Sequence, residues 1–148
     1  MNIWPFSHHE RDRCGVLVGD GAFVFPIVGE SHYQGELETI CGGKTSEGAR
    51  DRHAALLLPE PNNPYDRHAV CVKIFGKTVG YLSRDVAPDF LQALGRTEYR
   101  EIASEAIVVG GWHRRGGQDG FFGVRLNAAM PFEFIAAQEY FRKKEHSA

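Results

Sequence analysis

The fold is decided by the segment Leu58-Pro-Glu-Pro-Asn-Asn-Pro-Tyr-Asp-Arg-His-Ala-Val70 and by the apolar runs on either side of it. Its three prolines and two asparagines predict a rigid turn, because proline fixes φ and asparagine side chains bond to nearby backbone N–H groups. The turn carries an aromatic ring, Tyr65, and a carboxylate, Asp66, beside a predicted strand. A rigid turn with one ring and one acid can hold a small, specific part of a polymer.

Runs of β-branched and aromatic residues predict strands on both sides of this turn. The predicted strands are residues 23–28, 54–58, 69–75, 78–82, 105–113 and 121–126. Pro26 places the first strand at a sheet edge or a bulge, because proline cannot donate a ladder hydrogen bond. Gly76-Lys77 and Gly116-Gly117 predict the turns of two hairpins. Glycines 110, 111 and 123 predict bulges or tight corners within the later strands.

Short helices are expected between and after these strands, over residues 35–40, 84–94 and 135–144. Ser83 is the expected N-cap of the second helix, and Pro88 is compatible with it if the helix begins near Asp85. Six short strands with two or three small helices indicate a mainly β fold, a small OB-like or SH3-like six-stranded barrel. We expect an N-terminal extension over residues 1–20, the barrel domain over 21–130 and a C-terminal helical tail over 131–148.

Composition excludes several classes of protein. The chain has 148 residues, 43% hydrophobic and 24% charged, which is typical of one soluble domain. It has no membrane-spanning apolar stretch and no signal-peptide pattern at its start, so we expect a cytoplasmic protein with no membrane partner. A net charge of −2 and a pI near 6.4 exclude broad, non-specific binding to nucleic acid, and any such binding must come from a local pocket.

Patterns that resemble catalytic or cofactor motifs are incomplete. Gly43-Lys44-Thr45-Ser46 has Glu38 where a phosphate-binding loop requires glycine, and Gly19-Asp-Gly21 has Val24 where a dinucleotide fingerprint requires its third glycine. The three cysteines have no disulfide or zinc spacing. We therefore expect no catalytic residues, no metal site and no cofactor.

Exposed aromatic residues near polar turns are the remaining candidates for binding. On a small barrel, rings such as Tyr33, Tyr65 and Trp112 can stack on nucleobases, at ~1–3 kcal/mol per base. Packing in the core or at its rim is the alternative for each ring. Asp66 also has an alternative, which is to accept backbone N–H bonds in an Asx-turn. The residues alone leave these alternatives open.

Three motifs in the same order resemble the HIRAN domain. They are Val28-Gly-Glu-Ser-His-Tyr-Gln-Gly35, then Pro59-Glu-Pro-Asn-Asn-Pro-Tyr-Asp-Arg-His-Ala-Val70, then Val79-Gly-Tyr-Leu-Ser-Arg84 before a helix. The resemblance covers about residues 22 to 127. The family is best known at the N-terminus of a helicase-like transcription factor and in its yeast relatives in replication-fork repair. It also occurs as standalone bacterial proteins, the type that this chain resembles.

The resemblance implies an OB-like barrel that captures the 3′ end of single-stranded DNA. Tyr33 and Tyr65 match rings that contact the terminal bases. Asp66 matches the carboxylate that accepts a hydrogen bond from the 3′-hydroxyl, and Arg84 matches a basic residue near backbone phosphate. Ser31 and His32 stand where the eukaryotic repair members carry arginine and tyrosine, so a phosphate clamp is lost. Trp112 and Phe121 are both candidates for the family's late-strand stacking aromatic.

We therefore expect a non-enzymatic module that binds single-stranded DNA at its 3′-hydroxyl end, in DNA repair or replication. The expected binding residues are Ser31, His32, Tyr33, Tyr65, Asp66 and Arg84. Expected partners are single-stranded DNA ends, with RNA as an alternative ligand, and a repair, nuclease or helicase protein. The acidic net charge and the missing arginine favour the alternative of a protein-interaction adaptor. A small nuclease or phosphohydrolase is less favoured, because no metal-binding carboxylate cluster is apparent.

Overall fold

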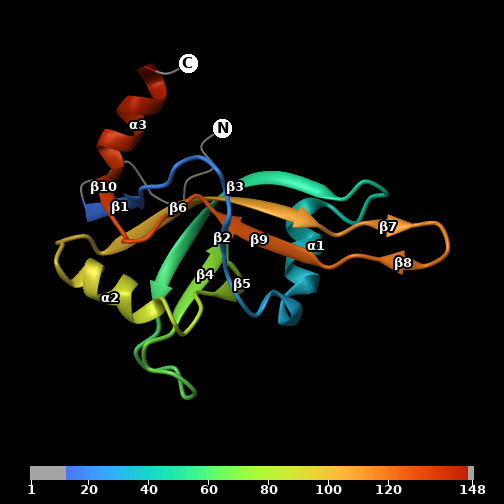
Figure 1. Cartoon of the computed structure of the whole chain (residues 1–148), viewed down its shortest axis with the longest axis horizontal. Helices are drawn as coiled ribbons and strands as arrows, with labels where there is room; N and C mark the ends of the chain where they lie inside the picture. Colours follow the sequence, from blue (N-terminus) through green and yellow to red (C-terminus); the bar gives the residue numbers. More distant parts are fainter. Residues whose placement is uncertain (1–12, 147–148) are drawn as a thin grey trace.

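The fold is mainly β, as the sequence predicts, with a curled sheet and helices around its outside (Figure 1). The computed structural model describes residues 13–146. Its strands are β1 (Cys14–Leu17), β2 (Phe25–Pro26), β3 (Ala49–Pro59), β4 (Val70–Ile74), β5 (Lys77–Tyr81), β6 (Glu101–Gly110), β7 (His113–Arg114), β8 (Gln118–Asp119), β9 (Phe122–Leu126) and β10 (Phe134–Ala136). Its helices are the 3-10 turn η2 (Glu30–His32), α1 (Gln34–Cys41), α2 (Ala87–Gly95) and α3 (Ala137–His146).

The sheet curls into a half-barrel around the long strands β3 and β6. β3 pairs antiparallel with β4 on one side and with β6 on the other, β5 follows β4, and β9 and β2 continue from β6. The gap between β5 and β2 is bridged by Val28 and Tyr81, whose backbone groups exchange hydrogen bonds of 2.8 and 2.9 Å. The six strands of this circuit correspond to the six predicted strands.

Two strands were not expected from the sequence. β1 pairs parallel with the first residues of β6, and β10 pairs antiparallel with β1. β1 therefore lies within the expected N-terminal extension and β10 within the expected C-terminal helical tail. With four and three residues respectively, they are too short to show a period-two pattern.

The first predicted strand, residues 23–28, is mostly irregular. Only Phe25–Pro26 pairs with β9, at an open edge as the proline predicted. Phe23 has a φ of 54°, which interrupts the extended backbone before the strand. The strand is therefore shorter than the apolar run that predicted it.

The β4–β5 hairpin confirms the second part of the opening segment. Ile74 pairs directly with Lys77, so the two loop residues are Phe75 and Gly76, with φ values of 51° and 73°. Two consecutive positive φ values define a type I′ turn, whose twist matches that of the strands. The predicted turn at Gly76-Lys77 is therefore wrong by one residue.

The second helix begins later than predicted. α2 starts at Ala87, and Ser83 does not act as its side-chain N-cap; instead the Ser83 carbonyl accepts the backbone N–H groups of Val86 and Ala87. Pro88 lies in the first turn of the helix, where a missing N–H leaves no bond unmade. The first helix matches its prediction closely, and the third is preceded by β10.

The core has two parts. The larger fills the inside of the curled sheet, and its largest buried side chains include Phe90, Phe122, Leu37, Leu57 and Ile102. The smaller lies between β1 and α3, around Cys14, Val16, Ala103 and Ala137. The three cysteines are free thiols. Within residues 13–146, none of the helices combines the length and apolar character needed to cross a bilayer.

Candidate functional site

The loop between β3 and β4 is held by the side chain of Asn63. Its Oδ1 accepts the backbone N–H groups of Tyr65 (2.9 Å) and Asp66 (3.1 Å), and its Nδ2 donates to Glu60 Oε1 (3.0 Å). The base of the loop is closed by the Glu60 N–H, which donates to the Ala69 carbonyl at 2.8 Å. The rigid turn predicted from the prolines and asparagines is therefore present, and Asn63 organises it.

Asp66 uses its two carboxylate oxygens differently. Oδ1 accepts the backbone N–H of His68 at 2.9 Å, which is the Asx-turn alternative considered for this residue. Oδ2 lies 3.8 Å from Nε of Arg84, whose side chain is 77% exposed. One oxygen thus holds the turn, while the other faces an exposed guanidinium group and can accept a further hydrogen bond.

The turn that carries His32 and Tyr33 is anchored on strand β9. Gln34 forms a pair of hydrogen bonds with Phe122: the Phe122 N–H donates to Oε1 (2.8 Å) and Nε2 donates to the Phe122 carbonyl (2.9 Å). Glu30 Oε2 accepts the N–H of Val124 at 3.2 Å. These side chains continue the ladder of β9 beyond β2 and fix η2 against the barrel. Sequence reasoning assigned no role to Glu30 or Gln34, although both lie within the first motif.

Tyr81 connects the two segments. The ring of Tyr33 lies against it, with centroids 6.5 Å apart, and His32 lies against Tyr33 at the same separation. Burial and then a hydrogen bond to Glu60 raise the pKa of the Tyr81 phenol above its ordinary value. Because Glu60 also bonds to Asn63, a chain of contacts runs from Tyr33 through Tyr81 to the β3–β4 loop.

A cavity of about 690 Å³ lies where these segments meet, within the usual size range of small-ligand sites. It is lined by Val28, His32, Tyr33, Asn63, Pro64, Tyr65, Asp66, Ala69, Tyr81, Leu82 and Arg84. We call it the end pocket. The structure therefore brings together five of the six residues proposed from sequence, and Ser31 is exposed on η2 without lining the cavity. Tyr65 is 87% exposed, so its ring stands free at the rim.

Neither candidate for the late-strand aromatic lines the end pocket in the described part of the chain. Trp112 packs against Gly120, where an added Cβ would collide with the indole, and the Arg114 guanidinium lies over the ring, 5.1 Å from its centroid. Phe121 is 75% exposed and follows the β7–β8 hairpin in sequence. This hairpin projects from the barrel (Figure 1).

The segment 43–46 follows helix α1 and precedes strand β3, whereas a phosphate-binding loop follows a strand and precedes a helix. Lys44 instead forms an ion pair with Asp119 at 3.6 Å. Across residues 13–146, no group of three or more histidine, cysteine, aspartate or glutamate side chains is arranged to hold a metal ion.

A curled six-strand circuit with aromatic rings, a carboxylate and an arginine around one cavity defines a small β-barrel binding domain. The chain matches the model of the HIRAN domain over residues 20–114, and it belongs to this family. HIRAN domains are nucleic-acid-binding modules, and they bind rather than catalyse. Among curated proteins and among solved structures, the comparisons found no match.

Proposed function

We propose that the end pocket binds single-stranded DNA at its 3′-hydroxyl end, in the context of DNA repair or replication. One observation carries the proposal: rings, a carboxylate and an arginine from three separate segments of the chain surround one cavity. In this role the module, acting in the cytoplasm, presents a strand end to a repair helicase or nuclease.

Asp66 is suited to read the chemical state of the end. A 3′-hydroxyl can donate a hydrogen bond to Asp66 Oδ2, which is not used by the turn. A 3′-phosphate would instead place negative charge against the carboxylate, and like charges in a pocket disfavour the wrong ligand. The pocket therefore favours a hydroxyl end.

The other contacts with the DNA strand would come from two tyrosine rings and from Arg84. The exposed ring of Tyr65 can stack on a base. The half-buried ring of Tyr33, which packs against Tyr81, can contact a second base. Stacking is worth ~1–3 kcal/mol per base. Arg84 is the one basic side chain among the lining residues apart from His32, in the part of the chain that the structure describes, so we expect few phosphate contacts and a shallow dependence of affinity on salt.

The test compares two exposed rings. Binding of a short labelled DNA strand with a 3′-hydroxyl is measured at low salt for the native protein, for Tyr65→Ala and for Phe75→Ala. Phe75 is 61% exposed in the β4–β5 turn and does not line the pocket, so it is the matched control. We expect Tyr65→Ala to weaken binding roughly 5- to 150-fold, from the stacking energy, and Phe75→Ala to leave it unchanged.

Equal losses in the two variants would show that the end pocket is not the site. If the native protein binds no strand even at low salt, the adaptor alternative replaces the proposal. The same strands, made of RNA, give the preference between the two nucleic acids. Incubation with Mg²⁺ or Mn²⁺ should leave the strands intact, because the module binds without cleaving.

A further inference from the structure

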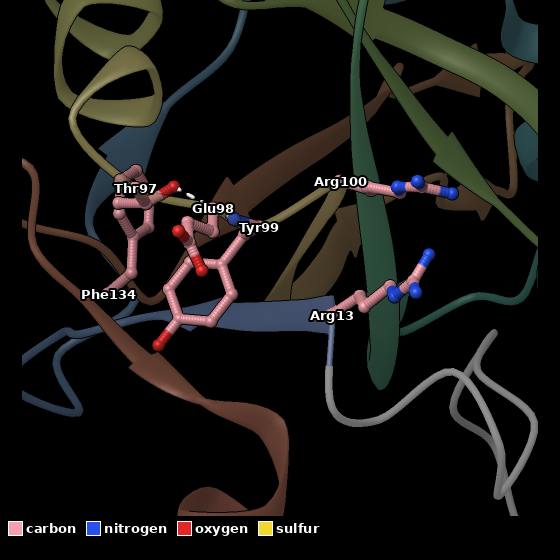
Figure 2. A pocket seen from close by; sticks show the side chains of 6 residues that line it. All are labelled: Arg13, Thr97, Glu98, Tyr99, Arg100 and Phe134. Atoms are coloured by element: carbon pink, nitrogen blue, oxygen red, sulfur yellow. Dashed lines mark hydrogen bonds between the residues drawn. The ribbon is translucent and has the colours of Figure 1, made fainter.

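A second cavity, of about 660 Å³, lies at the opposite end of helix α2 from the end pocket. Arg84 of the end pocket precedes α2, whereas this cavity is built from the residues that follow it. Its lining residues are Arg13, Thr97, Glu98, Tyr99, Arg100 and Phe134 (Figure 2). The two cavities share none of their lining residues among those described, so this one is separate from the end pocket. We call it the arginine pocket.

Two arginines are held side by side at this pocket. The backbone N–H of Arg100 donates to the Arg13 carbonyl at 2.8 Å, just before β1 and β6 begin to pair in parallel. Both side chains are exposed, and Figure 2 shows them extending to the same side of the pocket. In residues 13–146, no carboxylate lies within 4.0 Å of either guanidinium group. Like charges on neighbouring segments repel each other, so a bound anion would stabilise this pair of arginines.

The opposite side of the pocket is a fixed aromatic wall. Thr97 Oγ1 accepts the N–H of Tyr99 at 3.2 Å and donates to the Leu94 carbonyl at 2.8 Å, which ties the segment to the end of α2. The Tyr99 ring meets Phe134 edge to face, with centroids 6.5 Å apart. Gly15 lets the ring lie against β1, because a Cβ there would be 2.8 Å from Tyr99 Cδ2. The ring is thus held in place before any ligand arrives.

The negative charge of Glu98 restricts the kind of anion that the arginine pocket can bind. Its carboxylate lies beside Tyr99 and apart from the two guanidinium groups (Figure 2). A carboxylate would repel a simple phosphate, but it can accept hydrogen bonds from the amino group of a base. One side of the arginine pocket is therefore positively charged, through Arg13 and Arg100. The other side carries the aromatic ring of Tyr99 and the negative charge of Glu98.

We propose that the arginine pocket binds a nucleotide. Arg13 and Arg100 hold its phosphate, the base lies against Tyr99, and Glu98 accepts a hydrogen bond from an exocyclic amino group. Guanidinium groups suit phosphate because they donate several hydrogen bonds in a planar fork. The nucleotide is either a free mononucleotide or one unit of the strand whose end occupies the end pocket.

The first experiment titrates the full chain with adenosine monophosphate, adenosine and inorganic phosphate, by calorimetry. The proposal expects adenosine monophosphate to bind more tightly than either fragment. The double variant Arg13→Gln/Arg100→Gln should lose at least about tenfold in affinity, since each charged hydrogen bond is worth about that factor. Arg115→Gln, which changes an exposed arginine outside both pockets, is the matched control.

The second experiment separates the two sources of nucleotide. If the strand supplies it, mononucleotides bind weakly, and the double variant weakens binding of a labelled strand while its preference for a 3′-hydroxyl over a 3′-phosphate is unchanged. That preference depends on Asp66, so loss of the proposed end recognition and loss of the arginine pocket give different results. Equal binding of phosphate and adenosine monophosphate overturns the proposal. So does an equal loss in Arg115→Gln, or a double variant that melts as the native protein does and loses neither ligand.

Discussion

The two segments that form the end pocket are held in place in opposite ways. The β3–β4 loop, which carries Tyr65 and Asp66, is held by Asn63 through bonds to residues at most three positions away. The turn that carries His32 and Tyr33 is held by Gln34 and Glu30 through bonds to β9, 88 and 94 residues further along the chain. One segment keeps its shape by itself, whereas the other depends on its contacts with the distant strand β9.

Because of this difference, variants of the two anchors should affect the stability of the fold and the binding of a ligand to different extents. Breaking the long-range anchor should loosen the barrel together with the pocket, because β9 loses the side-chain hydrogen bonds that hold it beyond β2. Breaking the local anchor should change the pocket while most of the barrel is unaffected, because loops open locally at low cost. Variants of the two anchors therefore have different expected signatures.

The largest expected effect on stability is that of Gln34→Ala. The change removes three hydrogen bonds and leaves the N–H and carbonyl of the buried Phe122 without these partners. We expect the free energy of unfolding to fall by about 2–4 kcal/mol, measured by urea denaturation. Gln92→Ala, an exposed glutamine in α2, is the control and should change it by less than about 0.5 kcal/mol. Equal effects of the two substitutions would show that the anchor on β9 is unimportant.

Asn63→Ala should have a smaller effect on stability and a clear effect on binding. The side chain makes three bonds in a partly exposed loop, so we expect a loss of about 1–2 kcal/mol. Strand binding should weaken at least about tenfold, because Tyr65 and Asp66 lose their fixed positions. The neighbouring Asn62→Ala is the control for both measurements. A variant that loses stability but binds normally would contradict the role given to this asparagine.

The contrast between local and long-range contacts also explains which features could be predicted from the sequence. The loop was predicted because proline and asparagine act on their own backbone within a few residues, and the β4–β5 hairpin because its turn is local. The roles of Glu30 and Gln34 were missed because their partner strand is distant in sequence. Strands β1 and β10 were missed because they are short and lie on a second, smaller core.

The candidate site was proposed from resemblance more than from chemistry, and its role stays a prediction. Five of the six residues line one cavity, but their meeting depends on the Val28–Tyr81 bridge that closes the sheet, which no local pattern indicates. Tyr81, which connects the two segments, was not among the expected residues. The proximity of Arg13 and Arg100 could not be predicted either, because it depends on the register of the parallel pairing of β1 with β6, which the sequence did not indicate.

The smallest expected effect is that of Tyr81→Phe, which removes the bond to Glu60 and keeps the ring contact with Tyr33. We expect a loss of about 0.5–1 kcal/mol at neutral pH. Because the folded state raises the pKa of this phenol, the stabilisation is complete below the unfolded value of about 10 and is lost as pH rises above it. Urea denaturation between pH 7 and 11 should show the two proteins converging. A difference that grows with pH would contradict the assignment.

The central claim is that Asp66 reads the 3′ end. The measurement is the ratio of affinities for strands ending in 3′-hydroxyl and in 3′-phosphate, for the native protein and for Asp66→Asn. Asparagine keeps an acceptor for the His68 N–H, so the turn is retained while the charge is removed. We expect the native protein to prefer the hydroxyl end by about tenfold or more, from charge repulsion at close range, and the variant to lose most of that preference. A native protein that binds both ends equally, or a variant that keeps the full preference, would contradict the account.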